Sequence, residues 1–68
     1  MKIGVMYIQV YQDGTKVYLV PIAECKNGSV KVKIRSGRER KWRQDHFQPE
    51  FWNRFRECSE NEKVKFPL

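Results

Sequence analysis

The sequence has few of the residues that cross-link or catalyse. Among its 68 residues it has two cysteines, Cys25 and Cys58, and one histidine, His46. A secreted domain this small usually carries a denser set of disulfides, so we expect two reduced thiols in a cytoplasmic protein. These three side chains are the candidate metal ligands, but no C-x-x-C pair is present and a structural zinc ion needs four ligands. We therefore expect no metal site and no cofactor.

The sequence also lacks long hydrophobic runs and a glycine-rich phosphate loop. No apolar stretch approaches the roughly 18 residues that span a bilayer, which predicts no membrane partner. A Cys–His nucleophile pair is possible on paper, but no oxyanion site or pocket accompanies it. The chain is therefore not expected to be an enzyme. The four glycines are spaced as turn residues would be: Gly4, Gly14, Gly28 and Gly37.

The first half of the chain predicts two hairpins. Residues 3–11 are β-branched and aromatic and favour a strand, and Asp13-Gly14 then signals a turn into a second strand over residues 15–24. On that strand Tyr18, Val20 and Ile22 are expected on one face, and Val17, Leu19 and Ala23 on the other. Pro21 cannot donate a ladder hydrogen bond, which predicts an edge or a bend. Asn27-Gly28 signals a second turn, of type I′.

The third strand alternates cleanly, with Val30, Val32 and Ile34 inward and three basic residues outward. Ser36-Gly37 signals another turn, before a fourth strand over residues 38–44. Pro49 then opens a predicted helix over residues 49–58, whose apolar face consists of Phe51, Trp52, Phe55 and Cys58. Residues 63–66 are consistent with either a short closing strand or a frayed tail.

These elements predict one mainly β domain over residues 1–58, followed by a tail or closing strand over residues 59–68. A chain this small must bend its four or five antiparallel strands, so we expect a small SH3-like barrel or a strongly bent sheet, capped by the short C-terminal helix. The order of elements is similar to that of the small archaeal chromatin proteins with SH3-like barrels. The similarity is one of architecture, and no binding residues are transferred from it.

The charge is concentrated in one predicted hairpin. Residues 31–43 contain seven basic side chains and one acid, Glu39. The net charge of this stretch, +6, therefore equals the net charge of the whole chain. A local basic patch favours a polyanionic ligand. We therefore predict a non-catalytic nucleic-acid-binding domain of low sequence specificity. The candidate phosphate contacts are Lys31, Lys33, Arg35, Arg38, Arg40, Lys41 and Arg43.

Trp42 has two possible roles that depend on the pairing of this hairpin. A two-residue turn at Ser36-Gly37 places Lys31 opposite Trp42 and makes the tryptophan a stacking platform among basic groups. A three-residue loop places Val32 opposite Trp42 and makes it part of the core. We favour the second register because a small core needs large aromatics.

Two other interpretations of the basic hairpin remain open. Lysine on exposed strands can simply protect an edge against aggregation. Alternatively, the chain is a protein-interaction module, such as a small inhibitor or adaptor, that uses the hairpin against an acidic protein surface.

Overall fold

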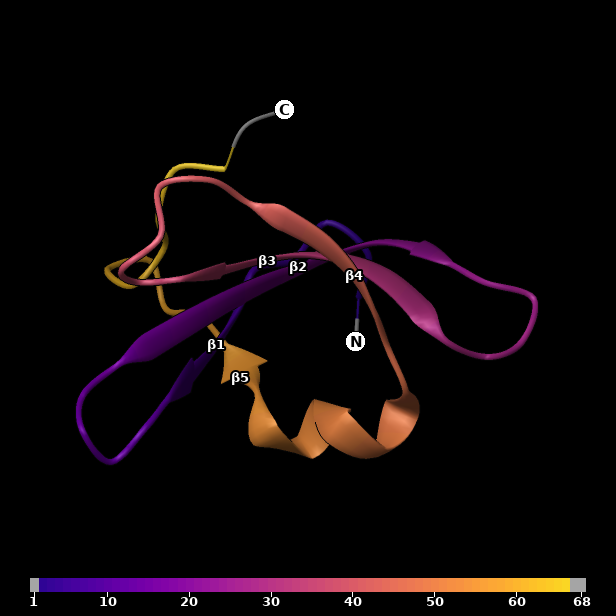
Figure 1. The fold of residues 1–68 in the computed structure, drawn as a ribbon, viewed down its shortest axis with the longest axis horizontal. Coiled ribbons are helices and arrows are strands. Elements are labelled where there is room, and N and C mark those ends of the chain that lie inside the picture. The colour runs from indigo at the N-terminus through magenta and orange to yellow at the C-terminus, as the bar shows by residue number, and fades with distance from the viewer. Residues whose placement is uncertain (1, 67–68) are drawn as a thin grey trace.

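The computed structural model describes residues 2–66, which form one antiparallel sheet and a short 3-10 helix. Its elements in chain order are β1 (Tyr7–Val10), β2 (Lys16–Glu24), β3 (Val30–Ser36), β4 (Arg43–Phe47), the 3-10 helix η1 (Pro49–Arg54) and β5 (Arg56–Glu57). The strand order is β4-β3-β2-β1-β5, and the twisted sheet is not closed (Figure 1). The predicted mainly β architecture is confirmed.

Both hairpin turns lie where Asp13-Gly14 and Asn27-Gly28 predicted them, but the predicted type I′ geometry is wrong. A type I′ turn needs positive φ at both central residues, and no residue in 2–66 other than glycine has a positive φ. Instead, Gly28 alone is left-handed at φ +87°, and its N–H donates to the carbonyl of Cys25 at 3.1 Å. The Asn27 side chain stabilises this turn by accepting a hydrogen bond from the Ser29 N–H at 3.1 Å.

The central strand β2 has apolar residues on both faces, as predicted, but Ala23 shares the face of Val20 and not the predicted face of Leu19. Tyr18 and Val20 pack in one core cluster and Val17 and Leu19 in the other. Pro21 does not lie at an edge, since it is fully buried in the middle strand. It lies at a bulge between Pro21 and Ala23, where the pairing with β3 shifts. A bulge bends and twists a strand, which accounts for a proline in this position.

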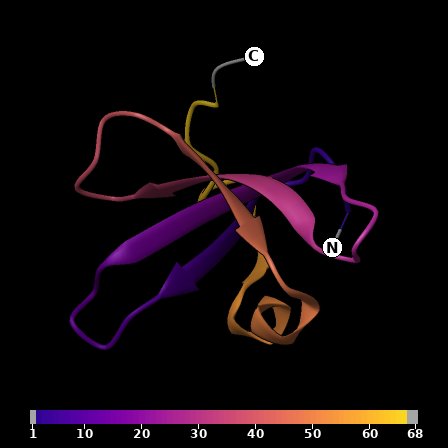
Figure 2. The same cartoon turned by 45° about the vertical axis from the view of Figure 1, so that its right-hand side comes forward.

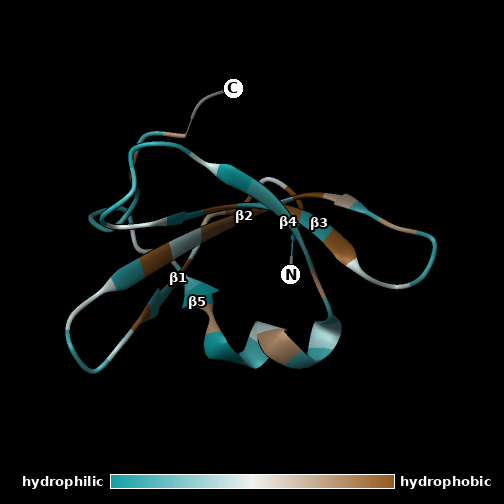
Figure 3. Cartoon of the chain, viewed as in Figure 1, coloured by the Kyte–Doolittle hydropathy of each residue, from teal (hydrophilic) through white to brown (hydrophobic). Residues whose placement is uncertain are grey.

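The 3-10 helix η1 covers one face of the sheet (Figure 2). The cluster beneath it contains Val17, Leu19, Val30, Val32 and Ile34, and the aromatic side chains Tyr7, Phe47, Trp52 and Phe55 pack against this cluster. Figure 3 shows that hydrophobic residues occupy the middle strands, whereas the edge strands β4 and β5 are largely hydrophilic. Of the aromatic residues after Pro49, Trp52 and Phe55 therefore cover this face of the sheet, whereas Phe51 is exposed.

The predicted helix over residues 49–58 is too long. The backbone of Phe55 is extended, with φ −115° and ψ 144°, and β5 begins at the next residue. Pairing with β1 through Ile8 and Arg56 draws the chain out of helical geometry. Consequently Cys58 leaves the predicted helical face and joins the cluster on the opposite side of the sheet.

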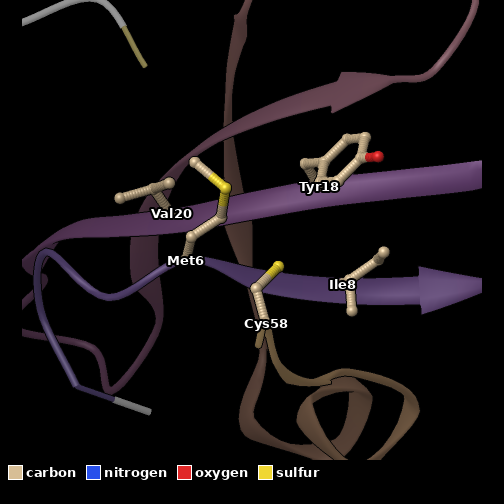
Figure 4. Packing of buried hydrophobic residues seen from close by; sticks show 5 residues of the cluster. All are labelled: Met6, Ile8, Tyr18, Val20 and Cys58. Carbon is tan, nitrogen blue, oxygen red and sulfur yellow. The ribbon is translucent and has the colours of Figure 1, made fainter. Parts of the chain in front are cut away.

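That second cluster consists of Met6, Ile8, Tyr18, Val20 and Cys58 (Figure 4). Trp42, Val64 and Phe66 pack against it. The segment 63–66 is irregular, without strand pairing, and its Val64 N–H lies 3.4 Å from the Met6 sulfur. Residues 67 and 68 of the predicted tail lie outside the described residues. The two faces of the sheet are thus covered by different segments, η1 on one and the C-terminal segment on the other.

The fourth strand and its register differ from both sequence predictions. Strand β4 spans Arg43–Phe47 instead of residues 38–44, and Ile34 pairs with Arg43. The intervening loop, residues 37–42, is therefore wider than either proposed turn. A residue outside the β3–β4 hairpin contributes to the conformation of this loop. The Gly37 N–H donates a hydrogen bond to the carbonyl of Lys16 on β2, at 2.7 Å. The favoured pairing of Val32 with Trp42 is wrong, since Val32 pairs with Asp45.

An ion pair holds the turn that leads into the C-terminal segment. Arg56 donates to Glu62 at 2.7 Å, and the Ser59 N–H donates to the same carboxylate at 2.9 Å. The hydrogen bonds from Arg56, and next those from Ser59, lower the pKa of Glu62 from 4.5 to about 2. The carboxylate is therefore charged in the folded protein at pH values where it would be protonated in the unfolded chain.

This pKa predicts acid sensitivity of the C-terminal segment. Because folding lowers the pKa, the stabilisation by Glu62 is fully present above pH 4.5 and is lost as the pH falls through about 2. Glu62→Gln should remove this contribution, so the melting temperature of the variant should fall less steeply on acidification than that of the wild type. Thermal melts across this pH range test the prediction, and equal pH dependence of the two proteins would contradict it.

Candidate nucleic-acid interface

Most basic side chains of the sheet project from one face, and its acidic side chains project from the other. Residues directly opposite each other in paired strands project to the same side, and successive residues alternate. The strand pairings therefore place five cationic residues on one face: Lys16, Lys31, Lys33, Arg35 and Arg56. We call this side of the sheet the basic face.

No acidic residue of the five strands projects from the basic face. The three strand acids Glu24, Asp45 and Glu57 are paired with Val30, Val32 and Tyr7 respectively, all of which belong to the face beneath η1. The sequence shows a basic stretch, but this separation of charge arises only from the strand registers. The cationic side chains of the basic face therefore have no acidic partner on the same face of the sheet. Arg56 is paired with Glu62, which lies in the turn before the C-terminal segment.

Lys31 and Lys33 occupy the part of the basic face formed by β3 and β4. Both are half-buried, and neither forms an ion pair with any residue in 2–66. On β4, Lys31 lies opposite His46 and Lys33 lies opposite Gln44. The two-residue turn would have placed Lys33 opposite Arg40, which is a destabilising like-charge pair. The wider loop avoids this repulsion and leaves both ammonium groups available.

Arg35 contacts two aromatic rings. Its guanidinium carbon lies 5.7 Å from the centre of the Tyr18 ring and 5.4 Å from that of Trp42. Its Nε is buried and has no hydrogen-bond partner among the described residues. Cation–π contacts with both rings fix the guanidinium in place and reduce the entropy that it would lose on binding an anion.

Trp42 is neither a core residue of the Val32 face nor a free stacking platform. It is half-buried, and its indole N–H donates to the carbonyl of Lys65 at 3.3 Å. Its ring also meets that of Phe66 edge-on, with centroids 5.0 Å apart. Arg35 also lies over the Trp42 ring, so this side chain already contacts three residues of the same chain. Sequence reasoning missed this arrangement because the partners of Trp42 come from the C-terminal segment.

The remaining predicted contacts divide between two locations. Arg38, Arg40 and Lys41 lie exposed in the loop between β3 and β4, without an ion pair to any residue in 2–66. Arg43 projects from the opposite face and forms a two-pronged ion pair with Glu39, at 2.9 and 3.1 Å. Hydrogen bonds from Arg43 and then from the Ser36 N–H lower the pKa of Glu39. Arg43 therefore braces the loop, and the structure does not bring it together with Lys31 and Lys33.

Lys16 belongs to the basic face but was not among the predicted residues. It is the first residue of β2, and a hollow of about 360 Å³ is lined by Lys16, Tyr18 and Arg38 together with the turn at Asp13. The hydrogen bond between Gly37 and the carbonyl of Lys16 brings the β1–β2 hairpin against the β3–β4 loop. No local sequence pattern indicates that these two distant segments meet.

The other candidate chemistry in the sequence does not gather into a site. Cys58 is buried, and this burial raises the pKa of its thiol, whereas Cys25 lies at the β2–β3 turn. Within residues 2–66 no three histidine, cysteine or carboxylate side chains form a group suited to a metal ion. No helix in that range is long and apolar enough to span a membrane. Comparisons with protein-family models, with curated proteins and with solved structures find no match for this chain.

Proposed function

We propose that this chain is a small, non-catalytic nucleic-acid-binding domain that contacts phosphates through the basic face and the adjoining β3–β4 loop. The contacts are Lys16, Lys31, Lys33, Arg35, Arg38, Arg40 and Lys41. The separation of charge across the sheet carries the proposal, because acids would be interspersed on a surface that served solubility alone.

The proposed mode of binding is contact with the sugar–phosphate backbone. Lysine and arginine contacts to phosphates position a protein on nucleic acid but carry no sequence information. Trp42 is occupied by Arg35, Lys65 and Phe66, so base stacking on this ring is not part of the proposed mode. Arg35, held by its contacts with two aromatic rings, acts as a fixed anchor on this surface.

We also propose that the five-stranded sheet is an open, SH3-like arrangement of strands. Strand β1 pairs with both β2 and β5, and the bulge in β2 bends the middle of the sheet. A bulge and the strand twist both roll an antiparallel sheet towards a barrel.

Salt dependence provides the direct test. Fluorescence-anisotropy titrations with labelled single- and double-stranded DNA and RNA should show binding at low salt, with similar affinity for unrelated sequences. With the seven proposed phosphate contacts on a duplex, log K should fall by about 0.9 per contact, or roughly 6, for each tenfold increase in salt concentration. Absence of binding to all four ligands at low salt would overturn the proposal.

An acidic protein is the competing ligand for the same surface, and a capture experiment with nuclease treatment distinguishes it from nucleic acid. Capture of a partner by the immobilised chain should be abolished by nuclease treatment if nucleic acid is the ligand. A captured protein that resists nuclease and is released by Lys31→Glu would favour the protein-interaction alternative.

A further inference from the structure

A second hollow lies on the opposite side of the sheet from the basic face. It has a volume of about 300 Å³ and is bounded by η1 and strands β1 to β4. Its apolar lining consists of Tyr11, Val17, Ile34, Phe47, Phe51 and Phe55. We call it the aromatic groove.

The walls of the aromatic groove are preformed. Phe47 makes edge-to-face contacts with Phe51, at a centroid distance of 6.3 Å, and with Phe55, at 5.8 Å. Nevertheless Tyr11 and Phe51 remain 48% and 40% exposed. Large aromatic side chains that are held in place and left in water at the edge of a groove are typical of binding surfaces.

The polar part of the groove is cationic. The Arg54 guanidinium lies 5.3 Å from the centre of the Phe51 ring and forms no ion pair with any residue in 2–66. No aspartate or glutamate is among the residues that line the groove. The ring holds the guanidinium beside the apolar surface, where a carboxylate of a ligand could pair with it.

Charge and size restrict the occupant. A second copy of this chain that docked groove to groove would bring its own Arg54 towards this Arg54, and like charge opposes such an association. The volume suits one large side chain and its neighbours, but not a packed domain. We propose that the aromatic groove binds a short extended protein segment that carries a phenylalanine or leucine side chain next to a carboxylate. This interaction is independent of the basic face and of its ligand.

The test uses the full chain, labelled with ¹⁵N, and a blocked hexapeptide of sequence Asp-Asp-Phe-Leu-Asp-Asp. Saturable amide shifts are expected at residues that line the groove, including Gln9, Tyr11 and Phe55. A second peptide with serine in place of phenylalanine and leucine keeps the charge and should lose these shifts. A third peptide with asparagine in place of aspartate keeps the apolar side chains and should bind about tenfold more weakly, the loss of one charge-assisted contact.

Two charge reversals on opposite sides of the molecule complete the design. Arg54→Glu should weaken binding of the first peptide at least about tenfold, whereas Arg38→Glu in the β3–β4 loop should leave the groove shifts unchanged. Shifts confined to the basic face, or equal affinity of Arg54→Glu and wild type, would overturn the proposal. Concentration-dependent shifts of the groove residues without peptide would also overturn it, since they would identify a second copy as the occupant.

Discussion

Replacing Trp42 with alanine is expected to destabilise the domain by about 2 to 4 kcal/mol, slightly less than the loss of a fully buried tryptophan. The substitution removes the packing of Trp42 against the Met6 cluster, its edge-on contact with Phe66 and its hydrogen bond to Lys65. It also removes one of the two rings that hold Arg35. Small domains have only about 5 to 15 kcal/mol of total stability, so a large part of it depends on this side chain.

Thermal and urea melts of Trp42→Ala measure the loss. At roughly 4 to 8 °C per kcal/mol for a domain of this size, the melting temperature should fall by at least about 8 °C. Trp42→Phe is the matched control, because it keeps an aromatic ring but not the N–H, and it should lose less. An unchanged melting temperature for Trp42→Ala would show that the C-terminal segment does not pack on Trp42 in solution.

The double variant Lys31→Glu, Lys33→Glu is expected to lose most of its affinity for nucleic acid. From the counterion-release slope, each phosphate contact contributes roughly tenfold at 0.05 M salt, so loss of two contacts should cost about a hundredfold or more. The introduced carboxylates would also repel the phosphates. Because His46 and Gln44 lie opposite these positions and no acidic residue of the five strands projects from the basic face, the fold should tolerate the change.

Titrations of this variant need a control for nonspecific charge effects. Arg54→Glu changes one charge on the far side of the sheet and should reduce nucleic-acid affinity only slightly. Thermal melts of the double variant should confirm that it remains folded. If a folded double variant bound DNA and RNA as tightly as wild type, the phosphate contacts would lie elsewhere and the proposed function would be wrong.

The sequence predicted strands and turns whose determinants are local. Asp13-Gly14 and Asn27-Gly28 marked both hairpins, since a left-handed glycine is required where each turn closes. The alternation around Val32 predicted β3 and its buried side. The extent of η1 was not predictable in this way, because pairing of Arg56 with Ile8 overrides the helical pattern that continues to Cys58.

The sequence predicted most of the basic residues of the candidate interface, but not how they are arranged on the sheet. Six of the seven predicted residues lie on the basic face or in its loop, but Arg43 projects from the other face and pairs with Glu39. Lys16 was missed because it lies outside residues 31–43, and only the strand pairing places it on the same face as Lys31 and Lys33. Trp42 was assigned to the wrong register because its partners are Lys65 and Phe66, which no pattern within the hairpin indicates.

The amino-acid sequence by itself determined the net charge of +6, its concentration in residues 31–43 and the strands that carry it. Only the tertiary structure decided which charges share a face. In a sheet the side-chain period is two, so a shift of β4 by one residue would exchange Asp45 and Arg43 with Gln44 and His46 across the sheet. That register depends on contacts made by Lys16 and Glu39 at the loop, and on packing of the distant C-terminal segment against Trp42, which are not encoded in the local pattern of β4.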